Sequence, residues 1–140
     1  MATISPDTDL ATRLRLGITR TARRLRQEAG GDLSPSLTAS LSTIAAHGPL
    51  TPSELATRER IQRPTATKVL ARLEAQGVVA RTADPQDRRS ALVAITPAGE
   101  ALLDELRTRK DAYLAQRLRT LSAEERATLR AASEILERLL

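Results

Sequence analysis

The chain has 140 residues and a formal net charge of +5 at pH 7. That length is typical of one domain and is sufficient to bury a hydrophobic core without disulfides or metals. The sequence contains no cysteine and a single histidine, His47. It therefore excludes disulfides, thiolate metal sites, thiol redox sensing and any metal site built from several histidines. We expect no metal and no cofactor.

The sequence also argues against a secreted protein, a membrane protein and an enzyme. Its first residues have neither the basic start nor the apolar stretch of a signal peptide. The longest segment without charged residues, 33–53, is rich in serine, threonine and proline and is unsuited to crossing a bilayer. No nucleophile–base pair and no phosphate-binding glycine loop is present. We expect a cytoplasmic protein that is not an enzyme and does not contact a membrane.

The positive charge is concentrated in the middle of the chain. Residues 1–33 carry six basic and four acidic groups, residues 34–95 carry eight and five, and residues 96–140 carry eight of each. All eight basic groups of the middle segment lie between Arg58 and Arg89. Such a cluster is typical of a surface that binds nucleic acid.

Periodicity and capping signals predict three helices before residue 61. Apolar residues at every third or fourth position predict the first helix over 7–29. Ser34, followed by proline, begins the second, which ends at residue 47 with Gly48 in the left-handed conformation. Residues 51–54, Thr-Pro-Ser-Glu, form a capping box that opens a short third helix ending near Arg60.

The next segment predicts a helix followed by a hairpin. The helix covers 63–76 and stops at Gly77. Strands are expected over 78–82 and 91–95, and the charged, turn-forming residues 83–90 lie between them. The apolar stripe expected to be buried on the helix consists of Ala66, Val69, Leu70 and Leu73.

Two further helices complete a mainly α (α+β) chain. A long helix starts at Thr96-Pro97, and a second capping box over 122–125 opens the last one. The helices near both ends of the chain carry continuous apolar stripes that a chain of this size cannot fully cover. This predicts a two-fold dimer in which a second copy covers them. These stripes are Leu14, Ile18 and Leu25 at one end and Leu129, Leu136 and Leu139 at the other.

Two short helices joined by a brief turn and followed by a hairpin form a winged helix-turn-helix. Its second helix can enter the major groove of DNA with its first residues toward the base edges. Pro64, Thr65 and Thr67 are small enough to let the backbone approach the duplex closely. Lys68 and Arg72 lie one turn apart on the exposed face, within reach of bases or phosphates. The tip of the hairpin is suited to the narrower, electronegative minor groove.

The sequence resembles the MarR-type transcriptional regulators over essentially its whole length. Three stretches carry the resemblance: 50–56, Leu-Thr-Pro-Ser-Glu-Leu-Ala; 63–67, Arg-Pro-Thr-Ala-Thr; and 73–79, Leu-Glu-Ala-Gln-Gly-Val-Val. The most specific stretch is 84–99, where an Asp-Arg-Arg tip leads into a strand and a Thr-x-x-Gly helix start. The chain departs from the pattern at Gln62, where many relatives have serine or threonine before the recognition helix.

The resemblance implies one MarR-type domain over 1–140, with the winged helix-turn-helix DNA-binding region at 34–95 and N- and C-terminal dimerisation helices at 1–33 and 96–140. It implies a homodimer on double-stranded DNA with a pseudo-palindromic operator. It also implies a repressor that a small anionic or phenolic effector releases. Asp87 would hold a wing arginine in position through a charge-assisted hydrogen bond. The candidate DNA-binding residues are Arg63, Pro64, Thr65, Thr67, Lys68, Arg72, Asp87, Arg88 and Arg89.

Several residues keep more than one interpretation. His47 is explained by the helix dipole, or alternatively by an effector-binding or pH-sensing role. Tyr113 is a core or dimer-seam residue, or alternatively an effector contact. The alternative function is a winged-helix protein-interaction adaptor without operator specificity, which would bind promoter DNA with no steep salt dependence. The arginines that either line a solvated face or meet an anion are Arg13, Arg20, Arg23, Arg24 and Arg26.

Overall fold

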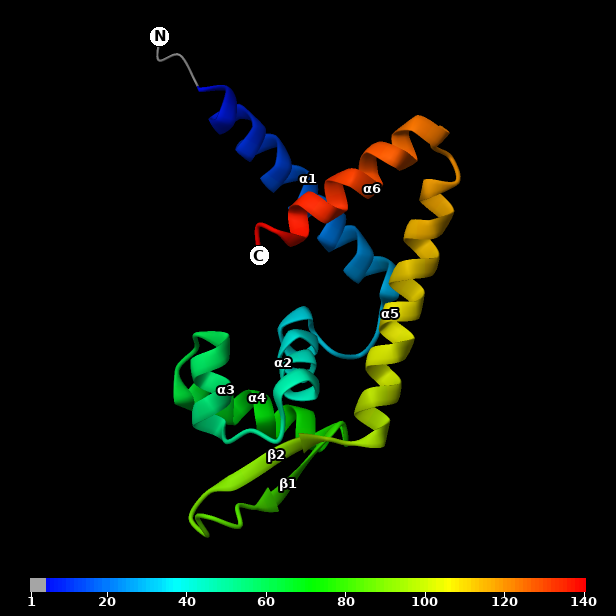
Figure 1. Ribbon diagram of the computed structural model, residues 1–140. Helices are drawn as coiled ribbons and strands as arrows, with labels where there is room; N and C mark the ends of the chain where they lie inside the picture. The colour runs from blue at the N-terminus through cyan, green and yellow to red at the C-terminus, as the bar shows by residue number, and fades with distance from the viewer. Residues whose placement is uncertain (1–4) are drawn as a thin grey trace. The chain divides into compact units, whose positions relative to one another are not determined.

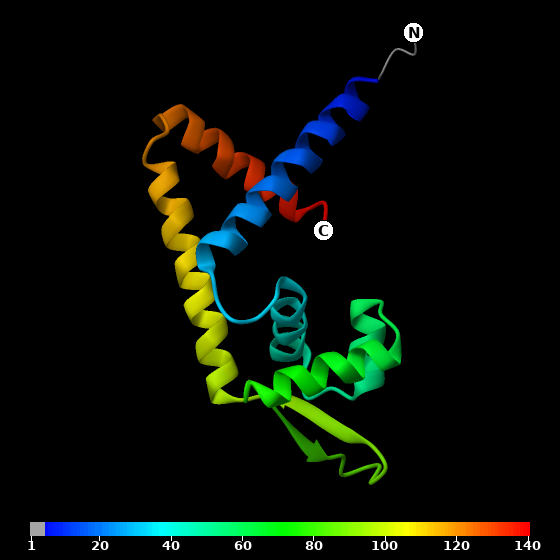
Figure 2. The ribbon, with the colours of Figure 1, turned by 180° about the vertical axis from the view of Figure 1, so that it is seen from behind.

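The computed structural model describes residues 5–140 (Figures 1 and 2). In chain order the elements are α1 (Pro6–Ala29), α2 (Pro35–His47), α3 (Pro52–Glu59), α4 (Arg63–Ala75), β1 (Val79–Ala83), β2 (Ala91–Ile95), α5 (Pro97–Leu118) and α6 (Ala123–Glu137). The mainly α fold with one small hairpin is confirmed. The chain divides into two compact units: residues 30–107, and the segment up to residue 29 together with 108–140.

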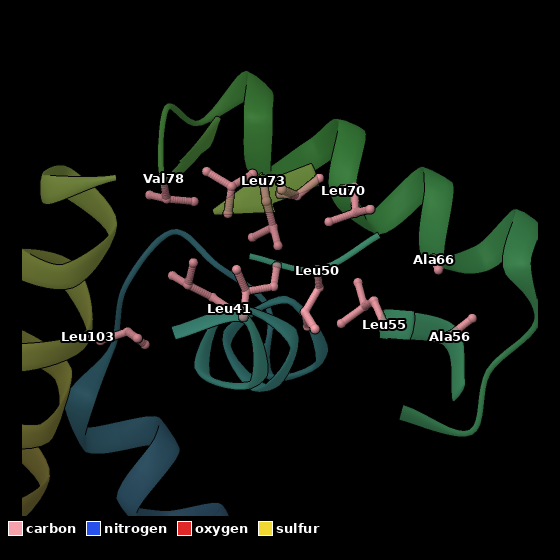
Figure 3. Close-up of a cluster of buried hydrophobic side chains, with 12 residues drawn as sticks. Leu41, Leu50, Leu55, Ala56, Ala66, Leu70, Leu73, Val78 and Leu103 are labelled. Carbon is pink, nitrogen blue, oxygen red and sulfur yellow. The ribbon is translucent and has the colours of Figure 1, made fainter. Parts of the chain in front are cut away.

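The unit of residues 30–107, called here the winged unit, has a well-filled hydrophobic core. Leu41 of α2, Leu55 of α3 and Leu70 of α4 are almost completely buried and belong to one cluster (Figure 3). The hairpin closes this core through Val93, whose backbone exchanges hydrogen bonds of 2.7 and 2.9 Å with Leu50. The apolar faces of three short helices and a hairpin are therefore buried within a single chain.

The end of α2 differs from the sequence-based expectation. Gly48 lies in extended backbone with φ −71°, not in the left-handed conformation, so that prediction is wrong. Pro49 follows it, and a proline restricts the residue before it to extended conformations. Glycine serves a different purpose here, because a Cβ at this position would lie 2.5 Å from the carbonyl oxygen of Ile44.

The predicted start of α3 is confirmed. The backbone N–H of Glu54 donates to Thr51 Oγ1, and the N–H of Thr51 donates to the Glu54 carboxylate at 2.8 Å. A further contact joins α3 to α2, in which the hydroxyl of Thr43 donates to the Glu59 carboxylate. At the end of α3, Arg60 adopts the left-handed conformation with φ 53°, which turns the chain sharply toward α4.

The hairpin is joined to the end of α4 by backbone hydrogen bonds. Gly77, with φ 72°, ends the helix as predicted. β1 begins at residue 79, one residue later than expected, because Val78 makes other bonds. Its N–H donates to Leu73 O, and its carbonyl accepts from Thr96 N. The antiparallel register then runs from Val79 opposite Ile95 to Ala83 opposite Ala91.

The other unit, called here the helical unit, consists of α1, the end of α5 and α6. Ser122 and Glu125 form the predicted capping box at the start of α6. In contrast to the winged unit, this unit leaves large apolar side chains exposed on all its helices. They are Leu10, Leu14, Leu16, Ile18, Leu114, Leu129, Ile135, Leu139 and Leu140. In residues 5–140 we find no helix with the length and apolarity needed to cross a membrane.

Candidate nucleic-acid interface

One face of α4 is buried and the other is exposed, as the sequence predicts. Ala66, Leu70 and Leu73 pack into the core, and Val69 is half-buried at the edge of the stripe. The opposite face carries Arg63, Pro64, Thr65, Thr67, Lys68 and Arg72, all exposed. This is the arrangement that a recognition helix needs, because the side chains that contact DNA bases must be free of packing contacts within the protein.

The first turn of α4 keeps hydrogen-bonding capacity. Within the described chain, Gln62 makes no side-chain hydrogen bond to this turn, in line with its departure from the serine or threonine of many relatives. The Thr67 hydroxyl donates to the Arg63 carbonyl at 3.0 Å, so its oxygen can still accept a bond. Helix N-terminal N–H groups also favour anions such as phosphate.

Two aspartates organise the tip of the hairpin, which is called the wing. Asp84 Oδ1 accepts from the N–H of Gln86, and Asp87 Oδ1 accepts from the N–H of Arg89, each at 2.9 Å. Asp87 thus holds Arg89 through its backbone rather than through its guanidinium. The side chains of Arg88 and Arg89 are exposed.

Acidic and basic groups of residues 34–95 are used differently. Each acid accepts an internal hydrogen bond: Glu54, Glu59, Glu74, Asp84 and Asp87. Among the residues that the structure describes, only Arg81 of this segment's basic groups forms an ion pair. The basic groups without one are Arg58, Arg60, Arg63, Lys68, Arg72, Arg88 and Arg89. Free cations beside internally bonded acids give this unit a surface suited to a polyanion.

The ion pair of Glu74 and Arg81 and the left-handed Arg60 were not predicted from the sequence. Glu74 and Arg81 are seven residues apart and lie on different elements, so no helical or strand periodicity connects them. The sequence indicates only that Arg58 and Arg60 belong to the basic cluster between Arg58 and Arg89. Their exposure beside the start of α4 adds two cations to the candidate interface.

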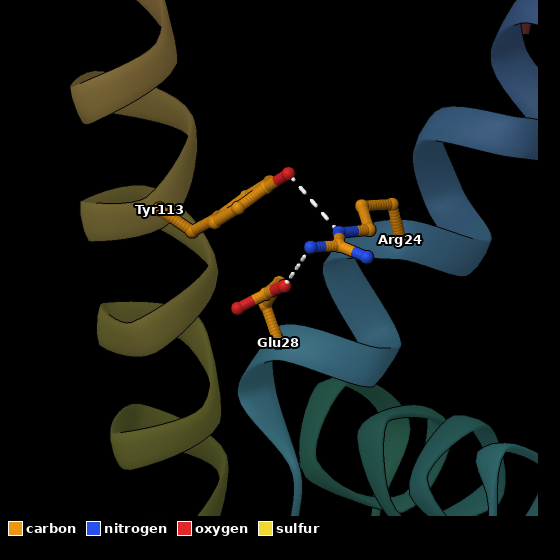
Figure 4. Close-up of polar contacts among 3 residues, drawn as sticks. All are labelled: Arg24, Glu28 and Tyr113. Atoms are coloured by element: carbon orange, nitrogen blue, oxygen red, sulfur yellow. Dashed lines mark hydrogen bonds and ion pairs between the residues drawn. The ribbon is translucent and has the colours of Figure 1, made fainter.

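In the helical unit, two arginines lie near Tyr113 of α5, and Figure 4 shows one of them, Arg24, together with Glu28. Arg24 Nε donates to the Tyr113 hydroxyl at 3.1 Å, and another nitrogen of Arg24 pairs with Glu28 at 2.5 Å. The guanidinium carbons of Arg24 and Arg117 lie 5.7 and 5.2 Å from the ring centroid. Hydrogen bonding from Arg24, and then from Arg117, lowers the pKa of Tyr113 below its ordinary value.

The remaining candidates make no comparable cluster. His47 is exposed in the last turn of α2, where the helix dipole favours a cation. Over residues 5–140, no group of three or more histidine, aspartate and glutamate side chains is placed to hold a metal ion.

The exposed α4, the turn before it and the wing define a winged helix-turn-helix. A family model described as "MarR family" matches residues 33–91. The HTH-type transcriptional regulator Mb0904 of Mycobacterium bovis is 37% identical over 134 residues, which cover 95% of this chain and 94% of that protein.

Solved structures agree with this family. A putative transcriptional regulator from Pseudomonas aeruginosa PA01 has a TM-score of 0.87 and 34% identity, covering 98% of this chain and 97% of that one. Wild-type MarR from E. coli, in its apo form, has a TM-score of 0.73 and 26% identity, covering 94% and 96%. The chain belongs to the MarR family of DNA-binding transcriptional regulators and is not an enzyme.

Proposed function

We propose that two copies of this chain bind a pseudo-palindromic operator and repress transcription from it. The observation that carries the proposal is the division of charge in residues 34–95, where the acids accept internal hydrogen bonds and the cations on α4 and the wing form no ion pair. In this proposal, residues 34–95 bind DNA, and residues 1–33 and 96–140 form the dimer. The exposed leucines of the helical unit support the second part, because a partner copy would bury them.

α4 and the wing have different roles in this proposal. Thr65, Lys68 and Arg72 lie where base edges of the major groove are in reach, so at least one of them sets specificity. Arg88 and Arg89 contact phosphates and the minor groove, where they add affinity with little sequence information. Asp87 holds the backbone of Arg89, which keeps the tip in a defined turn.

A salt titration of binding to operator and random duplexes tests these roles. Replacing Arg88 or Arg89 with alanine is expected to weaken binding to both duplexes and to lower the log–log salt slope by about 2 per dimer, one phosphate contact per protomer. Lys68→Ala or Arg72→Ala is expected to cost about 1–3 kcal/mol per half-site on the operator and much less on random DNA. Arg119→Ala, which removes an exposed arginine from the turn after α5, outside the DNA-binding residues 34–95, is the matched control.

Two outcomes would contradict the DNA-binding roles. If both wing variants bind with wild-type affinity and slope, the wing is not a DNA contact. If the wild-type chain binds promoter DNA without salt dependence and without preference for an inverted repeat, the adaptor function replaces operator binding.

The dimer is tested separately by geometry. Inverted half-sites about 10 bp apart place two recognition helices on one face of the duplex. An insertion of about 5 bp moves one half-site to the opposite face and is expected to abolish tight binding. Unchanged affinity after this insertion, or a monomer in sedimentation at micromolar concentration that keeps full DNA affinity, would contradict the symmetric arrangement.

We also propose that a small anionic or phenolic effector releases the repressor from DNA in the cytoplasm. Arg24 and Arg117 support this, because two guanidinium groups beside one phenol suit a small carboxylate or phenolate. Benzoate and phenol serve as probes of the two chemistries. Either is expected to lower the operator affinity of the wild type and to act more weakly on Arg24→Gln. If neither probe changes the operator affinity, the proposed effector site is wrong. If adding the protein increases transcription from the operator, the proposed repression is wrong.

A further inference from the structure

Arg81 differs from the other basic groups of residues 34–95. Its Nε lies 2.7 Å from Oε2 of Glu74, and both side chains are partly exposed, at 36% and 44%. The cations proposed to contact DNA form no ion pair within the described residues. Arg81 is therefore the one cation of this segment whose charge is used inside the protein.

The pair joins the two DNA-contacting elements. Glu74 lies in the last turn of α4, and Arg81 lies in the middle of β1, opposite Val93 of β2. Between them the chain turns at Gly77, which has a positive φ and open space around it. Glycine resists rotation less than other residues, so this turn alone is a weak constraint on the direction of the hairpin.

Other bonds hold the base of the wing and the middle of β2, where Val93, opposite Arg81, is bonded through its backbone to Leu50 of the segment before α3. Thr96 Oγ1 donates to the Gly77 carbonyl at 2.7 Å, and Thr96 N donates to the Val78 carbonyl at 3.0 Å. Both of these Thr96 bonds lie at the start of β1. The bond between Glu74 and Arg81 lies three residues beyond Val78 and joins the middle of β1 to α4 itself. The Leu50–Val93 bonds tie β2 to the segment before α3, whereas the Glu74–Arg81 bond ties β1 to the helix that is proposed to enter the major groove.

We infer that Glu74 and Arg81 are positioning residues, which fix the wing relative to α4, and that Arg81 is not a phosphate ligand. The inference rests on the proposed DNA-binding function. A wing held in its bound direction before binding does not have to be ordered by DNA, which raises the affinity without a new contact. A two-stranded hairpin is only marginally stable by itself, so its direction depends on such attachments.

The decisive variant is Glu74→Ala, because two explanations predict opposite signs. Removing a negative charge near DNA strengthens binding if only electrostatics acts. Losing the attachment weakens DNA binding by about threefold per half-site, and thus by about tenfold per dimer. The threefold effect lies in the upper part of the range for an exposed ion pair. Alanine also favours helix, so a weaker affinity does not come from a lower helix propensity of α4. Glu100→Ala, which removes an exposed acid of α5 in the same unit, is the matched control and is expected not to weaken binding.

Arg81→Ala and the double variant complete the cycle. Arg81→Ala is expected to weaken operator binding about tenfold with an unchanged salt slope, and the double variant is expected to bind no more weakly than either single variant. The reversed pair, Glu74→Arg with Arg81→Glu, is expected to return the affinity to within about threefold of the wild type. Thermal unfolding of each variant separates loss of fold from loss of direction.

The inference is overturned if Glu74→Ala binds operator as tightly as the wild type or more tightly. It is equally overturned if Arg81→Ala lowers the salt slope by about 2 per dimer, because Arg81 would then be a phosphate ligand. These outcomes leave the proposed function intact as long as the wild type binds operator with a steep salt dependence. Absence of that dependence in the wild type would instead remove the proposed function.

Discussion

The winged and helical units bury their apolar residues to different extents. In the winged unit, Leu41, Leu55 and Leu73 have no measurable exposure. In the helical unit, Ile18 is 50% exposed and Leu139 is 71% exposed. Exposed apolar residues in a row mark an interaction surface. This chain therefore completes the core of its DNA-binding unit by itself but leaves the apolar faces of its terminal helices exposed for the second copy proposed above.

The largest expected difference comes from shortening one leucine in each unit. Leu70→Ala leaves a cavity in the winged unit and is expected to lower the free energy of unfolding by about 2–5 kcal/mol. Leu139→Ala is expected to change it by less than about 0.5 kcal/mol within one chain and to weaken the dimer instead. Urea unfolding and sedimentation at several protein concentrations measure the two effects. If both variants lose the same free energy of unfolding, the two leucines are equally buried in solution and the contrast between the units is wrong.

Glycine substitutions are expected to act with opposite signs in the two units. A Cβ on Gly99 would overlap the carbonyl oxygen of Val78, so Gly99→Ala is expected to destabilise the protein by about 1–3 kcal/mol. Gly17 lies within α1 with no atom near its missing Cβ, so Gly17→Ala is expected to stabilise it by about 0.5–1 kcal/mol. Thermal unfolding of both variants checks this. A lower melting temperature for Gly17→Ala would mean that another surface packs against that position.

Arg60 offers a smaller test within the winged unit. A left-handed backbone is costly for arginine and easy for glycine, so Arg60→Gly is expected to stabilise the protein by about 0.5–1 kcal/mol. The control, Arg58→Gly, removes the same charge from a helical position and is expected to cost up to about 1 kcal/mol. Chemical denaturation compares the two. If both variants are destabilised equally, the arginine side chain at 60 contributes more than its backbone conformation costs.

The smallest effect is expected in the helical unit, in the titration of Tyr113. As the chain's only aromatic residue, it is the sole source of a phenolate absorbance signal. Its pKa is expected below the ordinary 10.0, and Arg24→Gln is expected to move it back up. The folded state thus releases the proton at lower pH than the unfolded state. The resulting stabilisation is complete above the unfolded pKa and is lost as the pH falls through the folded pKa. An unchanged titration in Arg24→Gln would mean that Arg24 does not hydrogen-bond the phenol in solution.

Much of the winged unit could be predicted because its signals are local. Ser34 and Thr51 open their helices through bonds to residues three positions away, and Gly77 ends α4 through its own conformation. The exposed and buried faces of α4 follow from helical periodicity alone. The prediction for Gly48 failed although it was also local. Glycine at the end of a helix favours the left-handed conformation, but Pro49 restricts the residue before it to extended backbone, and the second effect decides the conformation of Gly48.

By itself, the sequence determined the order of the helices and strands, the concentration of cations between Arg58 and Arg89, and the family. Each of these depends on neighbours in the chain or on composition. The tertiary structure alone decided that Arg81 pairs with Glu74 while Lys68 and Arg72 stay free, and that Arg24 reaches Tyr113. The physical reason is that a side chain's partner depends on distances between elements. Arg24 and Tyr113 are 89 residues apart, and only packing within the helical unit brings them to 3.1 Å.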